Sequence, residues 1–185
     1  MATKKKAAAP VKKAATKTKS AKPAFKKHVC SLKAGDKAPD FSGVDQNGKA
    51  ISLKDFNGKK LVLYFYPKDD TPGCTAQACS LRDQYAALKK KGIEIIGVSA
   101  DNEAKHQKFI DKYSLPFRLL ADTNHEVIKT YDVWGKKQFM GRVFDGLNRT
   151  TFLINEKGVI DHVIHQPDTK NHAEEVLTAW GYNNG

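Results

Sequence analysis

The apolar positions of the chain fall into short continuous runs separated by helical stripes. Residues 61–66 are all apolar and are followed by Pro67, which predicts a strand that is buried on both faces. Six further runs are predicted as strands: 41–44, 50–53, 93–99, 117–120, 150–154 and 159–164. Polar turn residues separate the first two of these runs and the last two, so each of these pairs is predicted to form a β-hairpin.

Between these strands the apolar residues recur at helical spacing. The first stripe consists of Ala78, Leu81, Tyr85 and Leu88. Three lysines and then Gly92 follow it, as is typical of the C-terminal end of a helix. Further stripes predict helices near residues 106–113, 126–131 and 173–180. Strands that alternate with helices indicate an α/β domain with a mixed central sheet flanked by helices and an N-terminal β-hairpin.

The beginning of the chain has a different character. Residues 1–28 contain ten lysines, no aspartate or glutamate, and almost no large apolar side chain. Such a segment cannot bury enough surface to offset the entropy of ordering, so residues 1–29 are predicted to be a disordered basic tail and residues 30–185 the folded domain. Without these ten lysines the net charge of +12 falls to +2. The basicity therefore belongs to the tail.

Composition also indicates where the protein is located and what its cysteines do. The sequence has no apolar stretch long enough to span a membrane and no secretory leader, so a cytoplasmic protein with no membrane partner is expected. Its three cysteines are Cys30, Cys74 and Cys79. In a reducing compartment a close cysteine pair points to catalysis or metal binding rather than to a structural disulfide. No second pair offers ligands at zinc spacing, and the six histidines are scattered, so no metal site is expected.

Cys74 lies where a helix should begin. Thr71 is a good N-cap residue and Pro72 a good first helical residue, which places Cys74 in the first turn. Free backbone N–H groups and the positive end of the helix dipole favour a thiolate there, so Cys74 is predicted to be reactive. Cys79 by itself is better explained as a small buried apolar residue of the same helix.

The residues around this site resemble those of a known family. Pro67, Thr71 and Cys74 match the P-x-x-x-T-x-x-C motif of the peroxiredoxins. The run 71–75, with Ala78-Cys79 after it, is similar to the bacterioferritin comigratory protein or peroxiredoxin Q group. Residues 146–154 resemble the second signature of that group, with residues 134–141 in its usual intervening loop. The likeness extends from about residue 32 to residue 180.

This resemblance implies a thioredoxin-like fold and a peroxidase that needs no metal or organic cofactor. Cys74 would be the nucleophile that attacks a hydroperoxide, and Cys79 would then form a disulfide with it. Thr71 would bond the sulfur and the peroxide, Arg149 would stabilise the thiolate, and Pro67 would shield the pocket. Thioredoxin or a similar dithiol would reduce the disulfide, and the likeness favours a monomer.

A disulfide between Cys74 and Cys79 conflicts with an intact helix. Five residues along a helix separate two Cα atoms by roughly 8.7 Å, which exceeds the limit of about 7 Å for a disulfide. We therefore expect the start of the helix to unwind on oxidation.

One departure from the group is Gln77, where its members usually carry a glutamate.

Two other functions are compatible with parts of the sequence. The basic tail suits a nucleic-acid-associated protein without enzymatic activity, held by weak, non-specific contacts of residues 1–28 and directed to a nucleoid or nucleus. A dithiol exchanger is less well supported, because such proteins use C-x-x-C spacing. Cys30 is expected to be a bystander thiol, His106 a packing residue, and His162 and His165 surface residues.

Overall fold

The continuous apolar run forms the middle strand of the domain. The structure, a computed structural model, describes Thr3 and residues 25–182. The strands are β1 (Ser42–Val44), β2 (Ala50–Ser52), β3 (Lys60–Phe65), β4 (Ile93–Ser99), β5 (Arg118–Ala121), β6 (Trp134–Phe139), β7 (Arg142–Leu147), β8 (Thr150–Ile154) and β9 (Ile160–His165). The helices are the 3₁₀ helix η1 (Leu53–Phe56), α1 (Pro72–Asp83), α2 (Tyr85–Lys90), α3 (Glu103–Tyr113), α4 (Glu126–Thr130) and α5 (His172–Ala179).

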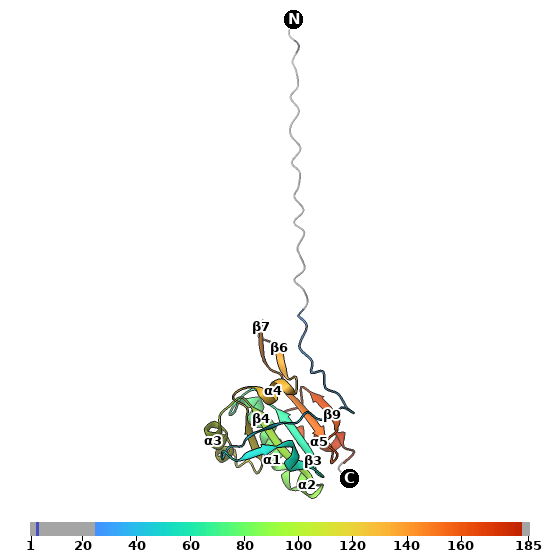
Figure 1. The fold of residues 1–185 in the computed structure, drawn as a ribbon. Coiled ribbons are helices and arrows are strands. Elements are labelled where there is room, and N and C mark those ends of the chain that lie inside the picture. Colours follow the sequence, from blue (N-terminus) through green and yellow to red (C-terminus); the bar gives the residue numbers. More distant parts are fainter. Residues whose placement is uncertain (1–2, 4–24, 183–185) are drawn as a thin grey trace.

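Five strands form the central sheet in the order β5-β4-β3-β8-β9 (Figure 1). β3 and β4 run parallel, as do β4 and β5, whereas β8 pairs antiparallel with both β3 and β9. The predicted mixed sheet flanked by helices is confirmed. The N-terminal hairpin is also confirmed as β1 and β2, which pair antiparallel.

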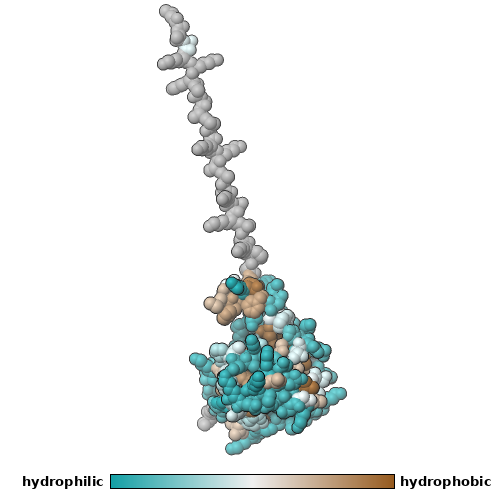
Figure 2. Space-filling model, turned by 90° about the vertical axis from the view of Figure 1, so that its left-hand side faces the viewer, coloured by the Kyte–Doolittle hydropathy of each residue, from teal (hydrophilic) through white to brown (hydrophobic). Residues whose placement is uncertain are grey.

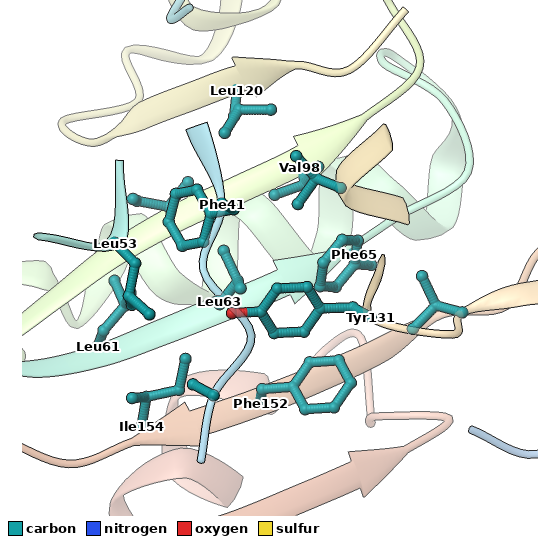
Figure 3. Packing of buried hydrophobic residues seen from close by; sticks show 14 of the residues in the cluster. Phe41, Leu53, Leu61, Leu63, Phe65, Val98, Leu120, Tyr131, Phe152 and Ile154 are labelled. Atoms are coloured by element: carbon teal, nitrogen blue, oxygen red, sulfur yellow. The ribbon is translucent and has the colours of Figure 1, made fainter. Parts of the chain in front are cut away.

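Side chains of β3 enter a different apolar cluster on each face of the sheet. Leu61, Leu63 and Phe65 pack on the face covered by α4 and the β1–β2 hairpin (Figure 3). Val62 and Tyr64 pack on the opposite face, against α1, α2, α3 and α5. Because Leu63 is fully buried, its replacement by alanine should cost about 2–5 kcal/mol.

The helix predicted after residue 71 is two helices. α1 ends and α2 begins around Gln84, whose backbone angles (φ −101°, ψ 7°) leave the helical region. After this break Leu88 is fully buried and the ring of Tyr85 lies 6.2 Å from that of Phe117. The apolar stripe is therefore correct, but the chain changes direction within it.

The segment expected to be a loop around residue 140 is a hairpin. β6 and β7 pair antiparallel from Trp134–Leu147 to Phe139–Arg142, and the ribbon projects from the body beside the start of the described chain (Figure 1). Its turn consists of Met140 (φ 47°) and Gly141 (φ 77°). Methionine is unusual in this left-handed turn position, where asparagine or glycine would signal a hairpin. The sequence therefore gives no clear hairpin signal here.

Most of the predicted basic tail lies outside the described residues. Within the described part, the backbone N–H of His28 donates to the carbonyl of Lys136 on β6 at 3.0 Å. The His28 ring lies 3.0 Å from a carboxylate oxygen of Asp132. Gly135 leaves room for this ring, since a Cβ there would stand 2.6 Å from the Cβ of His28. The chain is therefore held against the hairpin at His28.

Candidate active site

The first turn of α1 positions Cys74. Thr71 is the N-cap residue with extended backbone angles, Pro72 follows it, and the N–H of Thr75 donates to the carbonyl of Thr71 at 2.8 Å. This agrees with the predicted start of the helix. The Thr71 hydroxyl, however, does not cap the helix and instead donates to the carbonyl of Lys68 at 3.0 Å. The expected bond from Thr71 to the sulfur is not formed among the described residues.

Arg149 connects Cys74 to Gln77. Its Nη2 lies 3.3 Å from the Cys74 sulfur, and its Nη1 donates to Oε1 of Gln77 at 2.6 Å. Cys74 is 1% exposed and Gln77 is fully buried. A guanidinium fixed this close to a buried sulfur favours its anionic form, because burial weakens the screening by water. The residue that only the family likeness had selected thus lies against the predicted nucleophile.

Pro67 and Arg149 line a cavity of about 460 Å³ next to this site. Lys137 and Gln138 of β6 contribute to its wall, as do Phe25 and Lys27 from the segment held against the hairpin. Of these residues, the family likeness had singled out Pro67 and Arg149. The other four were missed, because nothing in their local pattern shows that the chain before the domain and the hairpin meet here.

The cavity wall is electropositive. The Lys137 ammonium donates to the carbonyl of Leu147 at 2.9 Å. Burial lowers the pKa of Lys137, and the nearby charges of Arg149 and Lys27 lower it further. Three cationic side chains thus surround one small opening, which favours the approach of an anionic or strongly polar substrate.

The remaining two thiols differ in setting. Cys79 is partly exposed on α1, five residues after Cys74, and Cys30, Cys74 and Cys79 are all free thiols. The Cys30 thiol donates to the carbonyl of Tyr131 at 3.1 Å. Burial raises the pKa of Cys30, although the N–H of Leu32 acts in the opposite direction. We therefore expect Cys30 to be less reactive than a thiol with a lowered pKa.

A buried polar network supports the loop between Pro67 and Thr71. Asp69 accepts a bond from the Tyr66 hydroxyl at 2.6 Å and lies 2.7 Å from Nδ1 of His106. The other ring nitrogen of His106 faces the carbonyl of Leu120 at 3.1 Å. His106 is therefore more than a packing residue: it is fully buried and ties α3 to the active-site loop. The sequence feature that could have indicated this role is the position of a histidine within an apolar helical stripe. His162 and His165 are exposed, as expected.

No group of three or more His, Cys, Asp or Glu side chains in residues 25–182 is arranged to hold a metal ion. Among the described helices, none is long and apolar enough to cross a bilayer.

Comparison with known proteins places this geometry in context. Residues 34–163 match the AhpC/TSA family. The chain is 49% identical to peroxiredoxin Bcp of Escherichia coli K12 over 146 residues, which cover 79% of this chain and 94% of that protein. It is 42% identical to peroxiredoxin Bcp of Bacillus subtilis, over 80% of this chain and 94% of the relative.

Solved structures give the same result. Peroxidoxin BcpB from Mycobacterium tuberculosis superimposes with a TM-score of 0.72 at 29% identity, covering 83% of this chain and 99% of that one. Peroxiredoxin Q from Xanthomonas campestris gives a TM-score of 0.71 at 31% identity, over 76% and 89% of the two chains. The comparisons lend no support to a non-enzymatic nucleic-acid protein.

Proposed function

Because the chain belongs to the AhpC/TSA family and is a peroxiredoxin, we propose that Cys74 is the thiol that its peroxidase activity uses. The observation that carries this proposal is the position of Arg149 between Cys74 and Gln77, 3.3 Å from the sulfur. Cys74 is the thiol that combines a helix N-terminus with an adjacent fixed cation, and both favour the thiolate.

In the first step the Cys74 thiolate attacks one oxygen of the hydroperoxide. A sulfur–oxygen bond forms, the oxygen–oxygen bond breaks, and the leaving oxygen takes a proton to become water or an alcohol. The product on the protein is a sulfenic acid. Arg149 can stabilise the negative charge that develops on the leaving oxygen, because it already donates toward the sulfur. Pro67 borders the opening through which the peroxide would enter.

In the second step the Cys79 thiol condenses with the sulfenic acid, which releases water and leaves a Cys74–Cys79 disulfide. Cys79 is partly exposed and lies five residues after Cys74 on α1, so the disulfide requires this part of the helix to unwind. A dithiol donor such as thioredoxin then reduces the disulfide by exchange and restores both thiols. The oxidant in this sequence is the hydroperoxide and the reductant is the dithiol.

The proposal is tested by peroxide-dependent NADPH oxidation coupled through thioredoxin reductase and thioredoxin. Cys74→Ser should abolish turnover. Cys79→Ser should stop turnover but still consume one equivalent of peroxide, and Cys30→Ser is the matched control that should behave as the unmodified protein. Mass mapping after one equivalent of peroxide should find the Cys74–Cys79 disulfide. Full activity of Cys74→Ser, or a disulfide that includes Cys30, would contradict the proposal.

A further inference from the structure

The exposed large apolar side chains gather at one end of the molecule. In the described part of the chain they are Val29, Phe139, Met140, Val143 and Phe144. Four of them form what we call the hairpin tip, made of Phe139, Met140, Val143 and Phe144 at the free end of β6 and β7. Met140 is 87% exposed and Phe139 67% exposed. Figure 2 shows brown and tan residues at the upper end of the body, next to where the described chain begins.

Positive charge surrounds this tip. Lys136, Lys137 and Arg142 lie on the same two strands. Asp145, the one acidic residue of the hairpin, lies 3.9 Å from the Lys136 ammonium, and the Lys137 ammonium donates to the carbonyl of Leu147. The backbone N–H of His28 bonds to the carbonyl of Lys136 on β6, and Lys27, one residue before it, lines the same cavity as Lys137. The sequence before Lys26 and Lys27 adds eight more lysines and no acidic residue. The hairpin that carries the apolar tip is thus hydrogen-bonded to the end of a segment whose sequence is strongly basic.

The turn of the hairpin retains an apolar residue against its conformational preference. Met140 has φ 47° and Gly141 has φ 77°, so both central turn residues are left-handed. Asparagine would adopt the conformation of Met140 more readily. The hairpin carries instead a long apolar side chain at its turn, where it is 87% exposed and contributes nothing to the core.

We propose that the hairpin tip and the adjoining lysines form a docking surface for an anionic lipid bilayer. Apolar side chains enter the interface of a membrane while flanking lysines and arginines contact acidic headgroups. The ribbon carries apolar side chains on both of its faces and at its end, which suits insertion among lipids better than a flat contact with one protein. The sequence analysis expects no membrane partner because the sequence has no membrane-spanning segment. A contact at the membrane surface does not require such a segment.

Docking in this orientation would also place the Cys74 cavity near the bilayer. Lys137 and Gln138 line that cavity and belong to the strand that ends in the tip. The contact itself does not depend on the peroxidase chemistry, so the docking surface and the proposed function can fail separately.

The test is sedimentation of the full-length protein with vesicles of phosphatidylcholine containing about a third phosphatidylglycerol. We expect binding to these vesicles, weaker binding to pure phosphatidylcholine, and release at high salt, where charges are screened. The triple variant Phe139→Thr, Met140→Asn and Phe144→Thr should bind these vesicles at least about tenfold more weakly than the unmodified protein. Threonine suits a strand and asparagine suits the turn, so the hairpin should be preserved.

Two controls give the result its meaning. Lys90→Ser with Lys157→Ser removes two exposed charges away from the hairpin and should leave binding unchanged. Activity toward hydrogen peroxide in solution should be retained by the triple variant, which shows that it is folded. Absence of binding to the anionic vesicles, or equal binding by the triple variant, would overturn the proposal. So would a concentration-dependent dimer that the triple variant abolishes while the vesicles bind neither protein.

Discussion

Gln77 holds Arg149 in place through a bond of 2.6 Å, and it does so without carrying a charge. The full positive charge of the guanidinium is thus left to act on the Cys74 sulfur. A glutamate at position 77 would neutralise part of that charge. We therefore expect the residue at position 77 to affect the reactivity of Cys74 through Arg149, because Arg149 contacts both side chains.

Gln77→Glu is expected to slow the reaction of Cys74 with iodoacetamide and with peroxide by about three- to tenfold near neutral pH, because the thiolate loses electrostatic stabilisation. The substitution breaks no bond of Nε2, which has no hydrogen-bond partner among the described residues. Gln84→Glu makes the same charge change at an exposed position at the end of α1 and should have little effect. Equal rates for both variants would contradict this role of Gln77.

Oxidation should unwind the start of α1. Five residues of intact helix separate Cys74 and Cys79 too far for a disulfide. Ala78, between them, and Leu81, two residues after Cys79, are fully buried. We expect amide exchange of residues 75–81 to be slow in the reduced protein and much faster after one equivalent of peroxide. Cys79→Ser, treated in the same way, should keep slow exchange. Equally slow exchange in the reduced and oxidised protein would exclude the unwinding.

Neighbouring carboxylates should differ in their effect on stability. Asp69→Ala leaves the buried Tyr66 hydroxyl and His106 without their shared partner, which should lower the free energy of unfolding by about 2–4 kcal/mol. Asp70 instead pairs with Lys112 at the surface, so Asp70→Asn should have a much smaller effect. Asparagine is chosen because residue 70 has a positive φ of 54°. Urea unfolding of both variants decides the matter, and equal losses would contradict it.

The stability of the β1–β2 turn should depend on acidic pH. Burial acts to raise the pKa of Asp45, but the N–H groups of Lys49 and Asn47 together with Arg118 outweigh it and hold the pKa below its usual value. A carboxyl with a depressed folded pKa stabilises the protein above its unfolded pKa, and this contribution disappears as the pH falls through the folded value.

Asp45→Asn should therefore lower the free energy of unfolding by about 1–2 kcal/mol at pH 7, with a difference that shrinks below about pH 4. Denaturant titrations at pH 7, 5 and 3 measure this. Asp83→Asn, which removes an exposed partner of Arg82, serves as the control and should show little pH dependence. A constant difference for Asp45→Asn at all three values would count against the assignment.

The sequence revealed those parts of the molecule that depend on local patterns. β3 was predictable from six consecutive apolar residues, and the place of Cys74 followed from Thr71 and Pro72. The β6–β7 hairpin was not, because its turn uses Met140 and its apolar residues face water instead of alternating against a core. The break at Gln84 depends on where α2 packs, which no periodicity within the stripe records.

The contacts of the active site depended on tertiary structure. Arg149 follows Cys74 by 75 residues, and only the family likeness singled it out among the arginines. The bond from Arg149 to Gln77 and the buried link between Asp69 and His106 join elements that are far apart in the chain. Likewise, the Thr71 hydroxyl could not be placed from its suitability as a cap, because the carbonyl of Lys68 competes for it.

The missing side chain at Gly135 has a consequence for how this enzyme can be shortened. Because His28 occupies the space beside Gly135, Phe25 and Lys27 line the cavity that Arg149 also borders, although both precede the matched family region of residues 34–163. A version that begins at residue 34 but keeps the rest of the chain would retain Cys74 and Arg149 and lose one side of this entrance. Substrate preferences measured on such a fragment would describe a wider mouth than the natural chain possesses.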